Sequence, residues 1–545
     1  MYQFQWETSN FVLLIFFLIL LSIEMRENWK SRAKVILSLV VAVILPIYLF
    51  GPNLKAQWWL IDDHEIFYFL KTEKNAAGWL DFFRILIDQT EVGQFGSSSR
   101  YRISYYALRI LETILWKDNV FLWYIFRMGI AILFSYSILR IFTRFFPLAL
   151  SILFLLSVFS FRYWSDIFSR LGTGEVYAVL GVGLILISLS RYEYRSENPI
   201  WIYILILLGV VIASGSKENF IPLILIPISI IWVERSQSRN WLKRLMLIFP
   251  VLFNLVTVVS LCLFFSKSKV DVYGNSVLLS DRISLLLTRF ENEFVLNMIT
   301  LIGGVLLLGS LAYLRDKKKL LSSILMIPVL FLGILLFNIL FYNGIWPTQS
   351  RYDFPGILTY QAGLFLLLYL NSESFLKLTN LPNEGVKVGV HGILTLFLVS
   401  LVSIKGMNNL QKDSRTNMKR TVAFQTSLNE IKSDSTSDVI ILYAHHALDY
   451  EPVDSFTRFL NYFENEKPKM ISVTNVSAES EFKNGLLDSL RRVSKSGSSE
   501  LKISPLDFDR LKGKSCLLVY FPPAVVENLP QIPGCRSLRT QIVPF

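Results

Sequence analysis

The feature that most limits what this chain can fold into is a series of long apolar segments with almost no charge. Twelve such segments, each about 16 to 23 residues long, can be traced along its 545 residues. An α-helix of that length crosses roughly 30 Å of hydrocarbon. A chain with 53% hydrophobic and 18% charged residues has too much apolar surface for an ordinary soluble fold. The pattern predicts an all-α polytopic membrane bundle with about 12 transmembrane helices. They are expected near residues 9–24, 34–51, 119–140, 145–161, 175–190, 199–214, 219–233, 244–265, 294–314, 320–342, 354–370 and 387–404.

Basic residues concentrate in alternate short loops between these segments, after the first, third, fifth, seventh and ninth. Examples are Arg26, Lys30, Arg140, Arg144, Arg191, Arg195, Arg235, Lys243, Arg315 and Lys317. Loops rich in Lys and Arg stay in the cytoplasm, so both termini are expected outside. The net charge of +12 then reflects membrane topology, and no nucleic-acid partner is expected. The first segment has no basic region before it and no small-residue cleavage site, so it is interpreted as a retained span.

The predicted membrane domain, 1–404, contains one large outer loop, 51–118. Two parts of this loop, Gly78–Thr90 and Arg100–Trp116, have apolar and polar residues on opposite helical faces. Both are predicted to be helices lying in the membrane interface. The polar face of the second carries Arg102, Tyr105, Arg109 and Glu112.

Residues 405–545 have a mixed polar composition that suits a small soluble α/β domain. Strands are expected at Asp438–Tyr443, Lys469–Val473 and Ser515–Phe521, and helices at Val453–Phe463 and Phe482–Val493. Cys516 and Cys535 lie in this tail, where a disulfide and two unpaired thiols are both open.

A compact acidic motif, Asp62-Asp63-His64-Glu65, directly follows the second apolar segment. Neighbouring carboxylates next to lipid repel one another, so at least one would be protonated or the group would hold a cation. Such a group suits a general base, or a divalent metal such as Mg²⁺ or Mn²⁺, which prefers oxygen ligands. A solvated acidic loop is the equally open alternative. No zinc-type ligand spacing is present.

Basic residues are few on the predicted outer side, but several stand where the chain enters or leaves the bilayer. They are Arg100, Arg102, Arg162, Arg170, Lys217 and Arg351. Guanidinium groups bind phosphate oxygens, so as a set these residues favour a lipid-phosphate site. Any one of them alone is explained as well by snorkelling to headgroups. Glu175 and Glu218 follow in the same short loops, where pairs such as Arg170 with Glu175 would act as structural locks.

The order and sidedness of these motifs resemble the GT-C glycosyltransferase superfamily, which includes protein O-mannosyltransferases and the aminoarabinose transferases of lipid A. The resemblance spans about residues 34–370. It rests on the acidic pair that opens the first outer loop, the interfacial helices and three short motifs. Those motifs are Arg100-Tyr101-Arg102, Lys217 before Phe220-Ile221-Pro222, and Arg351-Tyr352-Asp353-Phe354-Pro355. An additional N-terminal span is a departure from many family members.

This resemblance implies an inverting glycosyltransferase that moves a sugar from a polyprenyl-phosphate donor to a glycolipid, polysaccharide or protein acceptor. Asp62, or in second place Asp63, would be the general base. The donor phosphate would be bound by Arg100, Arg102, Arg170, Lys217 and Arg351, and the sugar or acceptor oriented by His64, Glu65, Glu175, Glu218 and Tyr352. The expected location is a bacterial inner membrane, with the site and the tail domain facing the periplasm.

A transporter or flippase of lipid-linked saccharides is the alternative from another class. Transport usually requires ionisable residues at mid-bilayer, and few are present: Arg127 stands within the third segment, whereas Asn254 and Asn338 are polar but uncharged. A non-catalytic scaffold would leave the acidic motif unexplained.

Overall fold

The structure is a computed structural model and describes most of the first half of the chain and much of the tail. The described ranges are 31–61, 63–73, 79–98, 100–144, 146–193, 197–234, 240–267, 383–443, 450–463, 470–474, 508–521 and 534–544, with single positions 14, 15, 17–19, 280, 284, 351, 354 and 532. The predicted spans at 294–314 and 320–342, nearly all of the spans at 9–24 and 354–370, and the predicted helix Phe482–Val493 lie outside these residues.

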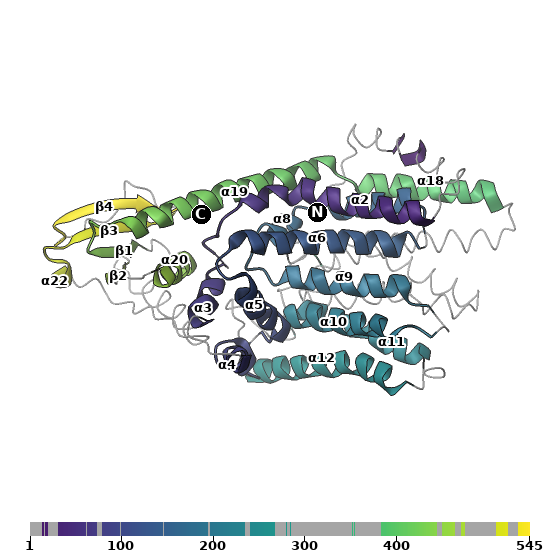
Figure 1. Ribbon diagram of the computed structural model, residues 1–545, viewed down its shortest axis with the longest axis horizontal. Helices are drawn as coiled ribbons and strands as arrows, with labels where there is room; N and C mark the ends of the chain where they lie inside the picture. Colours follow the sequence, from purple (N-terminus) through teal and green to yellow (C-terminus); the bar gives the residue numbers. More distant parts are fainter. Residues whose placement is uncertain are drawn as a thin grey trace.

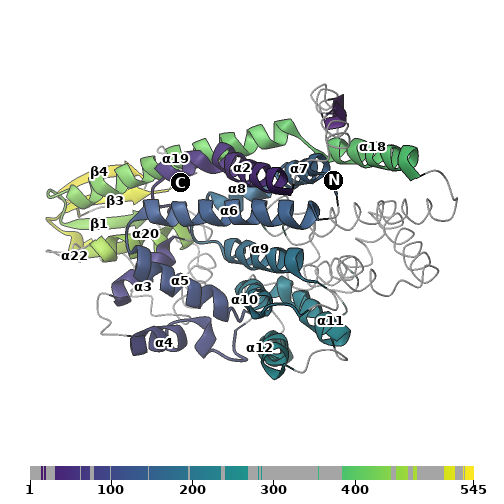
Figure 2. The same cartoon turned by 45° about the vertical axis from the view of Figure 1, so that its right-hand side comes forward.

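Apolar helices lie side by side and form the larger part of the fold (Figures 1 and 2). They are α2 (Ser31–Phe50), α6 (Val120–Phe142), α7 (Leu148–Val158), α9 (Glu175–Arg191), α10 (Ile200–Ser216), α11 (Leu225–Glu234), α12 (Trp241–Lys267) and α18 (Asn383–Leu401). Within the described ranges, three helices are long and apolar enough to cross a membrane, and a fourth if α18 and the helix after it form one bent span. The predicted helical membrane protein is confirmed at this level, whereas the number of 12 spans stays a prediction.

Helices α9 and α10 approach closely because small residues face each other. A Cβ placed on Gly181 would lie 2.5 Å from the carbonyl oxygen of Gly209 and 2.8 Å from Cβ of Ala213. Without a membrane-internal hydrophobic effect, close packing of this kind is a main source of helix association in lipid.

Replacing Gly181 with alanine should therefore destabilise the bundle. The added methyl group meets backbone atoms, which cannot rotate away, so we expect a loss of about 1–3 kcal/mol in the free energy of unfolding. Gly129 on α6 is the matched control, because a Cβ there meets nothing within 4 Å. Thermal unfolding in detergent should show Gly129→Ala unchanged or more stable. Equal melting temperatures for Gly181→Ala and the wild type would contradict the packing described here.

The first large loop folds into short helices at one end of the bundle. These are η1 (Gly51–Lys55), α3 (His64–Glu73), α4 (Trp79–Asp88), η2 (Glu91–Gly93) and α5 (Ile103–Trp116). The two predicted helices of the loop are confirmed as α4 and α5, whereas α3 was not anticipated. The polar stripe of α5 differs from the simple interfacial picture, because Arg109 and Glu112 are buried against the bundle. Glu112 is buried because it binds Arg127 on α6 and Tyr177 on α9.

The tail begins with the long helix α19 (Ile404–Ser433), which follows α18 and runs outward beside α2 (Figure 1). It leads into a parallel four-stranded sheet of order β2-β1-β3-β4. The elements are β1 (Val439–Tyr443), α20 (Tyr450–Phe463), β2 (Met470–Thr474), α22 (Phe508–Leu511), β3 (Ser515–Tyr520) and β4 (Ser537–Ile542). The predicted α/β domain is thus present, with three of its strands where the sequence placed them.

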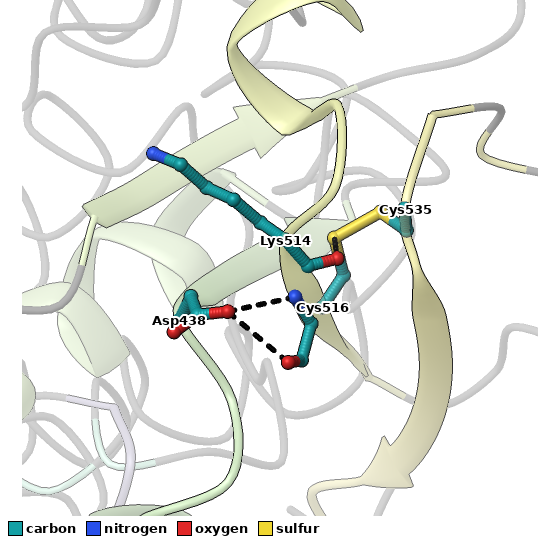
Figure 3. The surroundings of a disulfide bond; sticks show 5 residues. Asp438, Lys514, Cys516 and Cys535 are labelled. Carbon is teal, nitrogen blue, oxygen red and sulfur yellow. Dashed lines mark hydrogen bonds between the residues drawn. A yellow bond between two sulfur atoms is a disulfide. The ribbon is translucent and has the colours of Figure 1, made fainter.

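Cys516 and Cys535 form a disulfide that joins the start of β3 to the segment before β4. Figure 3 shows Asp438 beside it, where its Oδ2 accepts hydrogen bonds from the backbone N–H of Ser515 (2.8 Å) and from the Ser515 hydroxyl (3.1 Å). Of the two alternatives left open by the sequence, the structure therefore has the disulfide.

The sheet domain packs against the first large loop. The ring of Phe459 on α20 lies 4.4 Å from that of Phe67 on α3, and Gln57 N–H donates to Thr421 Oγ1 on α19 at 2.9 Å. The sheet domain, the short loop helices and the acidic motif therefore share one end of the bundle (Figures 1 and 2).

The C-terminal ends of α6, α9 and α11, which lead into the basic loops, meet at the opposite end of the bundle. Arg144 donates to the carbonyl oxygens of Leu189 and Tyr192, at 3.1 and 2.7 Å. The hydroxyls of Tyr192 and Tyr203 both donate to Glu234 Oε1. Helices α6, α9 and α11 therefore run in the same direction and α10 runs opposite to them, as the loop charges require.

Candidate functional site

Asp63 joins two loops at the end of the bundle that carries the sheet domain. Its side chain is fully buried. Oδ2 accepts from Trp59 N–H at 2.8 Å and Oδ1 accepts from Gly172 N–H at 3.1 Å. The carboxylate thus closes the turn after η1 and ties it to the loop before α9. The contacts give Asp63 a structural role, and its neighbour Asp62 lies outside the described residues.

Glu65, on the first turn of α3, contacts α5 through a tyrosine. The Tyr105 hydroxyl lies 2.6 Å from Glu65 Oε2, to which it donates, and 3.0 Å from the carbonyl oxygen of Gly172. Burial, with the nearby Glu65 charge, raises the pKa of Tyr105 well above its usual value, so this hydroxyl stays a donor. A Cβ on Gly174 would lie 3.2 Å from the Tyr105 ring, so the loop before α9 has little room there. Tyr105 therefore couples the acidic motif to that loop.

Three cations converge on two buried carboxylates beside this contact. Arg102 donates to Glu218 through Nε and Nη2, at 2.8 and 3.0 Å. Lys217 Nζ lies 2.7 Å from Glu175 Oε1, and Arg351 Nε lies 3.7 Å from Glu175 Oε2. We name these five residues the cation cluster.

Local structure explains how the cation cluster forms. Arg102 directly precedes α5, and Glu175 is the first residue of α9, where the helix dipole favours a carboxylate. Lys217 has extended backbone between α10 and η3 (Glu218–Ile224), and this break turns the side chains of residues 217 and 218 into the cluster. Lys217, Glu175 and Glu218 are all at most 4% exposed. Charges this deeply buried persist only when they are paired and hydrogen-bonded.

Lys217 is the member whose charge is most sensitive to its surroundings. Burial, together with the adjacent Arg102 and Arg351 guanidinium groups, lowers its pKa to about 7 against the opposing attraction of Glu175 and Glu218. An ammonium that titrates near neutrality responds strongly to an added anion.

Glu91, which the sequence analysis missed, lies near the same cluster. Burial raises the pKa of its carboxyl group, and Arg100 and Arg102 lie close enough to oppose this rise. Its Oε2 has no hydrogen-bond donor among the residues that the structure describes. In the sequence, the only indication of a role for Glu91 is its position between the two amphipathic segments. In the structure it directly follows Thr90, whose side chain caps η2.

A second buried network lies behind Tyr105. Arg127 on α6 pairs with both oxygens of Glu112 on α5, at 3.0 and 3.1 Å, and its Nη2 also donates to the carbonyl oxygen of Leu171. The Tyr177 hydroxyl donates to Glu112 Oε2 at 2.6 Å. This network fastens α5 to α6 and α9. The Arg109 guanidinium lies fully buried over the rings of Tyr105, Trp123 and Tyr177, at 5.3 to 5.6 Å.

The structure thus brings together most of the predicted site residues that it describes. Arg102, Glu175, Lys217, Glu218 and Arg351 form the cation cluster. Glu65 and Arg100 both lie near Glu91, which also lies near Arg102 and Glu218 of the cluster. Arg170 lies near Asp166 instead of forming the suggested pair with Glu175. His64 begins α3. Asp62 and Tyr352 lie outside the described residues. Within the described ranges, no three His, Cys, Asp or Glu side chains are grouped as metal ligands.

No protein-family model matches the chain, and no curated protein sequence is detectably similar to it.

Proposed function

We propose that the protein is an inverting glycosyltransferase that moves a sugar from a polyprenyl-phosphate donor to a glycan, glycolipid or protein acceptor at the outer face of its membrane. In this proposal the chain has about 12 transmembrane helices in a GT-C-like arrangement and resides in a bacterial inner membrane. The end that carries the sheet domain faces the periplasm.

The observation that carries the proposal is the cation cluster. Arg102, Lys217 and Arg351 come from three distant parts of the chain and meet at one end of the apolar helices, beside the acidic motif. A lipid-linked sugar presents its phosphate at this level of the membrane and its sugar just beyond it. Cations and carboxylates side by side suit a donor that is anionic at one end and rich in hydroxyls at the other.

The chemistry assigned to these residues is a single displacement. Asp62 takes the proton of the acceptor nucleophile, whose lone pair attacks the anomeric carbon of the sugar. The bond from that carbon to the phosphate oxygen breaks, and its electron pair stays on the polyprenyl phosphate. Lys217 and Arg351 stabilise the charge that develops on this leaving group, while Glu175 holds both cations in place. Glu65 accepts a hydrogen bond from a hydroxyl of the sugar or acceptor.

The disulfide in the sheet domain supports the outer location. Cys516–Cys535 forms part of the domain that packs on the first large loop. Disulfides persist in oxidising compartments such as the periplasm. The basic residues at the opposite end of the helices, including Arg144, suit the cytoplasmic side.

The test is a transfer assay with the purified full chain, membranes that supply labelled polyprenyl-phosphate sugars, and an acceptor-containing envelope extract. Label should reach an acceptor with the wild type and fall at least about 100-fold with Lys217→Met, as when a preorganised charge-stabilising group is lost. Arg84→Gln on α4 is the control, since this cation is exposed and pairs only with Asp81 of its own helix among the described residues. Absence of transfer from every donor class, together with passage of lipid-linked sugar across reconstituted vesicles, would favour a flippase instead.

Donor binding should weaken as the pH rises through neutrality. The pKa of Lys217 is lowered to about 7, so the ammonium is protonated below that pH and is lost above it. A bound phosphodiester keeps its single charge across this range and raises the pKa of Lys217, so affinity should fall by up to about tenfold per pH unit above 7. Titration with a polyprenyl-phosphate-sugar analogue between pH 6 and 9 measures this. Lys217→Arg should flatten the curve; an unchanged curve in that variant would remove Lys217 from donor binding.

A further inference from the structure

The first half of α19 carries a stripe of basic side chains on the face opposite its buried side. The basic stripe consists of Lys405, Lys412, Arg415, Lys419 and Arg420, all of them exposed. The first four are separated by seven, three and four residues, which places them on one face of a helix. Met407, Leu410 and Ser414 line the other face and are buried.

The charges of the basic stripe have no partner within the described part of the protein. None of its five side chains forms an ion pair or a hydrogen bond there. The one carboxylate between residues 404 and 420, Asp413, lies 3.5 Å from Arg162 of another segment. The stripe therefore directs an uncompensated positive field away from the protein.

Three contacts fix the level of the stripe relative to the membrane. Tyr48 on α2 donates to Asn408 at 3.0 Å, Asn417 donates to Asn53 on η1 at 3.0 Å, and Gln57 donates to Thr421. Residues 412–419 of α19 thus run alongside the last residues of the candidate span Ala33–Lys55. That is the level at which the hydrocarbon ends and the headgroup layer begins.

The neighbouring surface of α2 is apolar and exposed. Ile44, Ile47 and Tyr48 are 61%, 49% and 45% exposed in the last two turns of the helix, as expected of a face turned to lipid. A lipid whose acyl chains cover this face would present its phosphate to the stripe.

We propose that the basic stripe of α19 binds the phosphate groups of anionic phospholipids, which hold this helix and the attached sheet domain against the membrane surface. We assign bulk phospholipid to the stripe because its side chains are exposed on the face of α19 opposite the buried side. The cation cluster, in contrast, is buried between helices and is assigned to the lipid-linked sugar. The inference goes beyond the proposed sugar transfer and does not depend on it.

A proximity measurement on the full chain tests this directly. A donor dye is attached to Thr416→Cys, in the middle of the stripe, after the exposed Cys262 is changed to serine. Nanodiscs of phosphatidylcholine contain a minor fraction of phosphatidylglycerol with an acceptor dye on its headgroup.

The stripe variant carries Lys412→Gln, Arg415→Gln and Lys419→Gln. The matched control removes the same charge from the sheet domain through Lys512→Gln, Lys514→Gln and Arg536→Gln.

Energy transfer in the wild type should exceed that expected for randomly distributed lipid and fall at high salt. The stripe variant should bind the labelled lipid at least roughly tenfold more weakly, since each basic residue at a membrane surface contributes separately to the attraction. The control should match the wild type, and all three proteins should melt at the same temperature. Equal transfer in the wild type and the stripe variant would overturn the proposal. So would displacement of the labelled lipid by polyprenyl phosphate but not by unlabelled phosphatidylglycerol.

Discussion

Replacing Glu112 with leucine should lower the free energy of unfolding by about 3–5 kcal/mol, because the substitution leaves a buried cation without its counter-charge. Arg127 is 1% exposed and pairs with both oxygens of Glu112, and the Tyr177 hydroxyl donates to the same carboxylate. The other hydrogen bonds of Arg127, to the carbonyl oxygen of Leu171 and the Tyr177 hydroxyl, are made to neutral groups and cannot neutralise the charge. Thermal unfolding in detergent, with intrinsic fluorescence and gel filtration, measures the loss.

The double variant Glu112→Leu with Arg127→Met should regain most of that stability. With both charges removed, no uncompensated group is left in the interior, and apolar side chains of similar volume can fill the space. The exposed pair of Arg84 and Asp81 on α4 is the control, and Asp81→Asn should change stability by less than about 1 kcal/mol. Additive losses in the double variant would mean that the two residues contribute independently.

We expect the two neighbouring aspartates of the acidic motif to have different roles, Asp62 in catalysis and Asp63 in stabilising the fold. Asp62→Asn is expected to reduce sugar transfer by about 10²–10⁴-fold at an unchanged melting temperature, as when a general base is lost. Asp63→Asn should instead cost about 3 kcal/mol of stability, because a neutral amide replaces a carboxylate that accepts the backbone N–H groups of Trp59 and Gly172.

Measuring melting temperature and transfer on the same preparations distinguishes these outcomes. Full transfer by Asp62→Asn would exclude that residue as the base. An Asp63→Asn protein as stable as the wild type would show that the turn after η1 does not need its charge. A loss of both stability and transfer in both variants would mean that the motif acts as one structural unit.

The helices and strands of the described regions were largely predictable because they depend on local pattern. The span at 119–140 became α6, and the segments Gly78–Thr90 and Arg100–Trp116 became α4 and α5. The strands at 438–443 and 515–521 became β1 and β3 of a buried parallel sheet, whose apolar runs are easily recognised.

Elements with weak patterns were missed. Helix α19 has a polar sequence, and its buried positions include Ser414 and Thr421 as well as apolar residues, so its 30 residues carry little amphipathic signal. Strand β4, Ser537–Ile542, is exposed at the edge of the sheet and lacks the apolar run of its neighbours. Helix α3 begins within the acidic motif, and the charged residues at its start interrupt the apolar pattern by which a helix is recognised in the sequence.

The candidate site was predictable as a set of residue types but not as a set of partners. Sequence position indicated that Lys217, Glu175 and Arg351 would lie at the membrane edge, since each stands at or next to the end of an apolar segment. Which carboxylate pairs with which cation depends on helix packing, and the suggested partner of Glu175, Arg170, was replaced by Lys217. Burial of the α5 polar stripe depends likewise on Arg127, which is more than ten residues away in sequence and on another helix.

The most direct test of the central claim is an experimentally determined structure with a non-transferable polyprenyl-phosphate-sugar analogue bound. The analogue's phosphate should lie within hydrogen-bond distance, about 2.7–3.2 Å, of Lys217 Nζ or the Arg351 guanidinium, with the sugar directed toward Asp62 and Glu65. A phosphate bound instead at the opposite end of the helices, near Arg144 and Arg191, would contradict both the site and its orientation in the membrane.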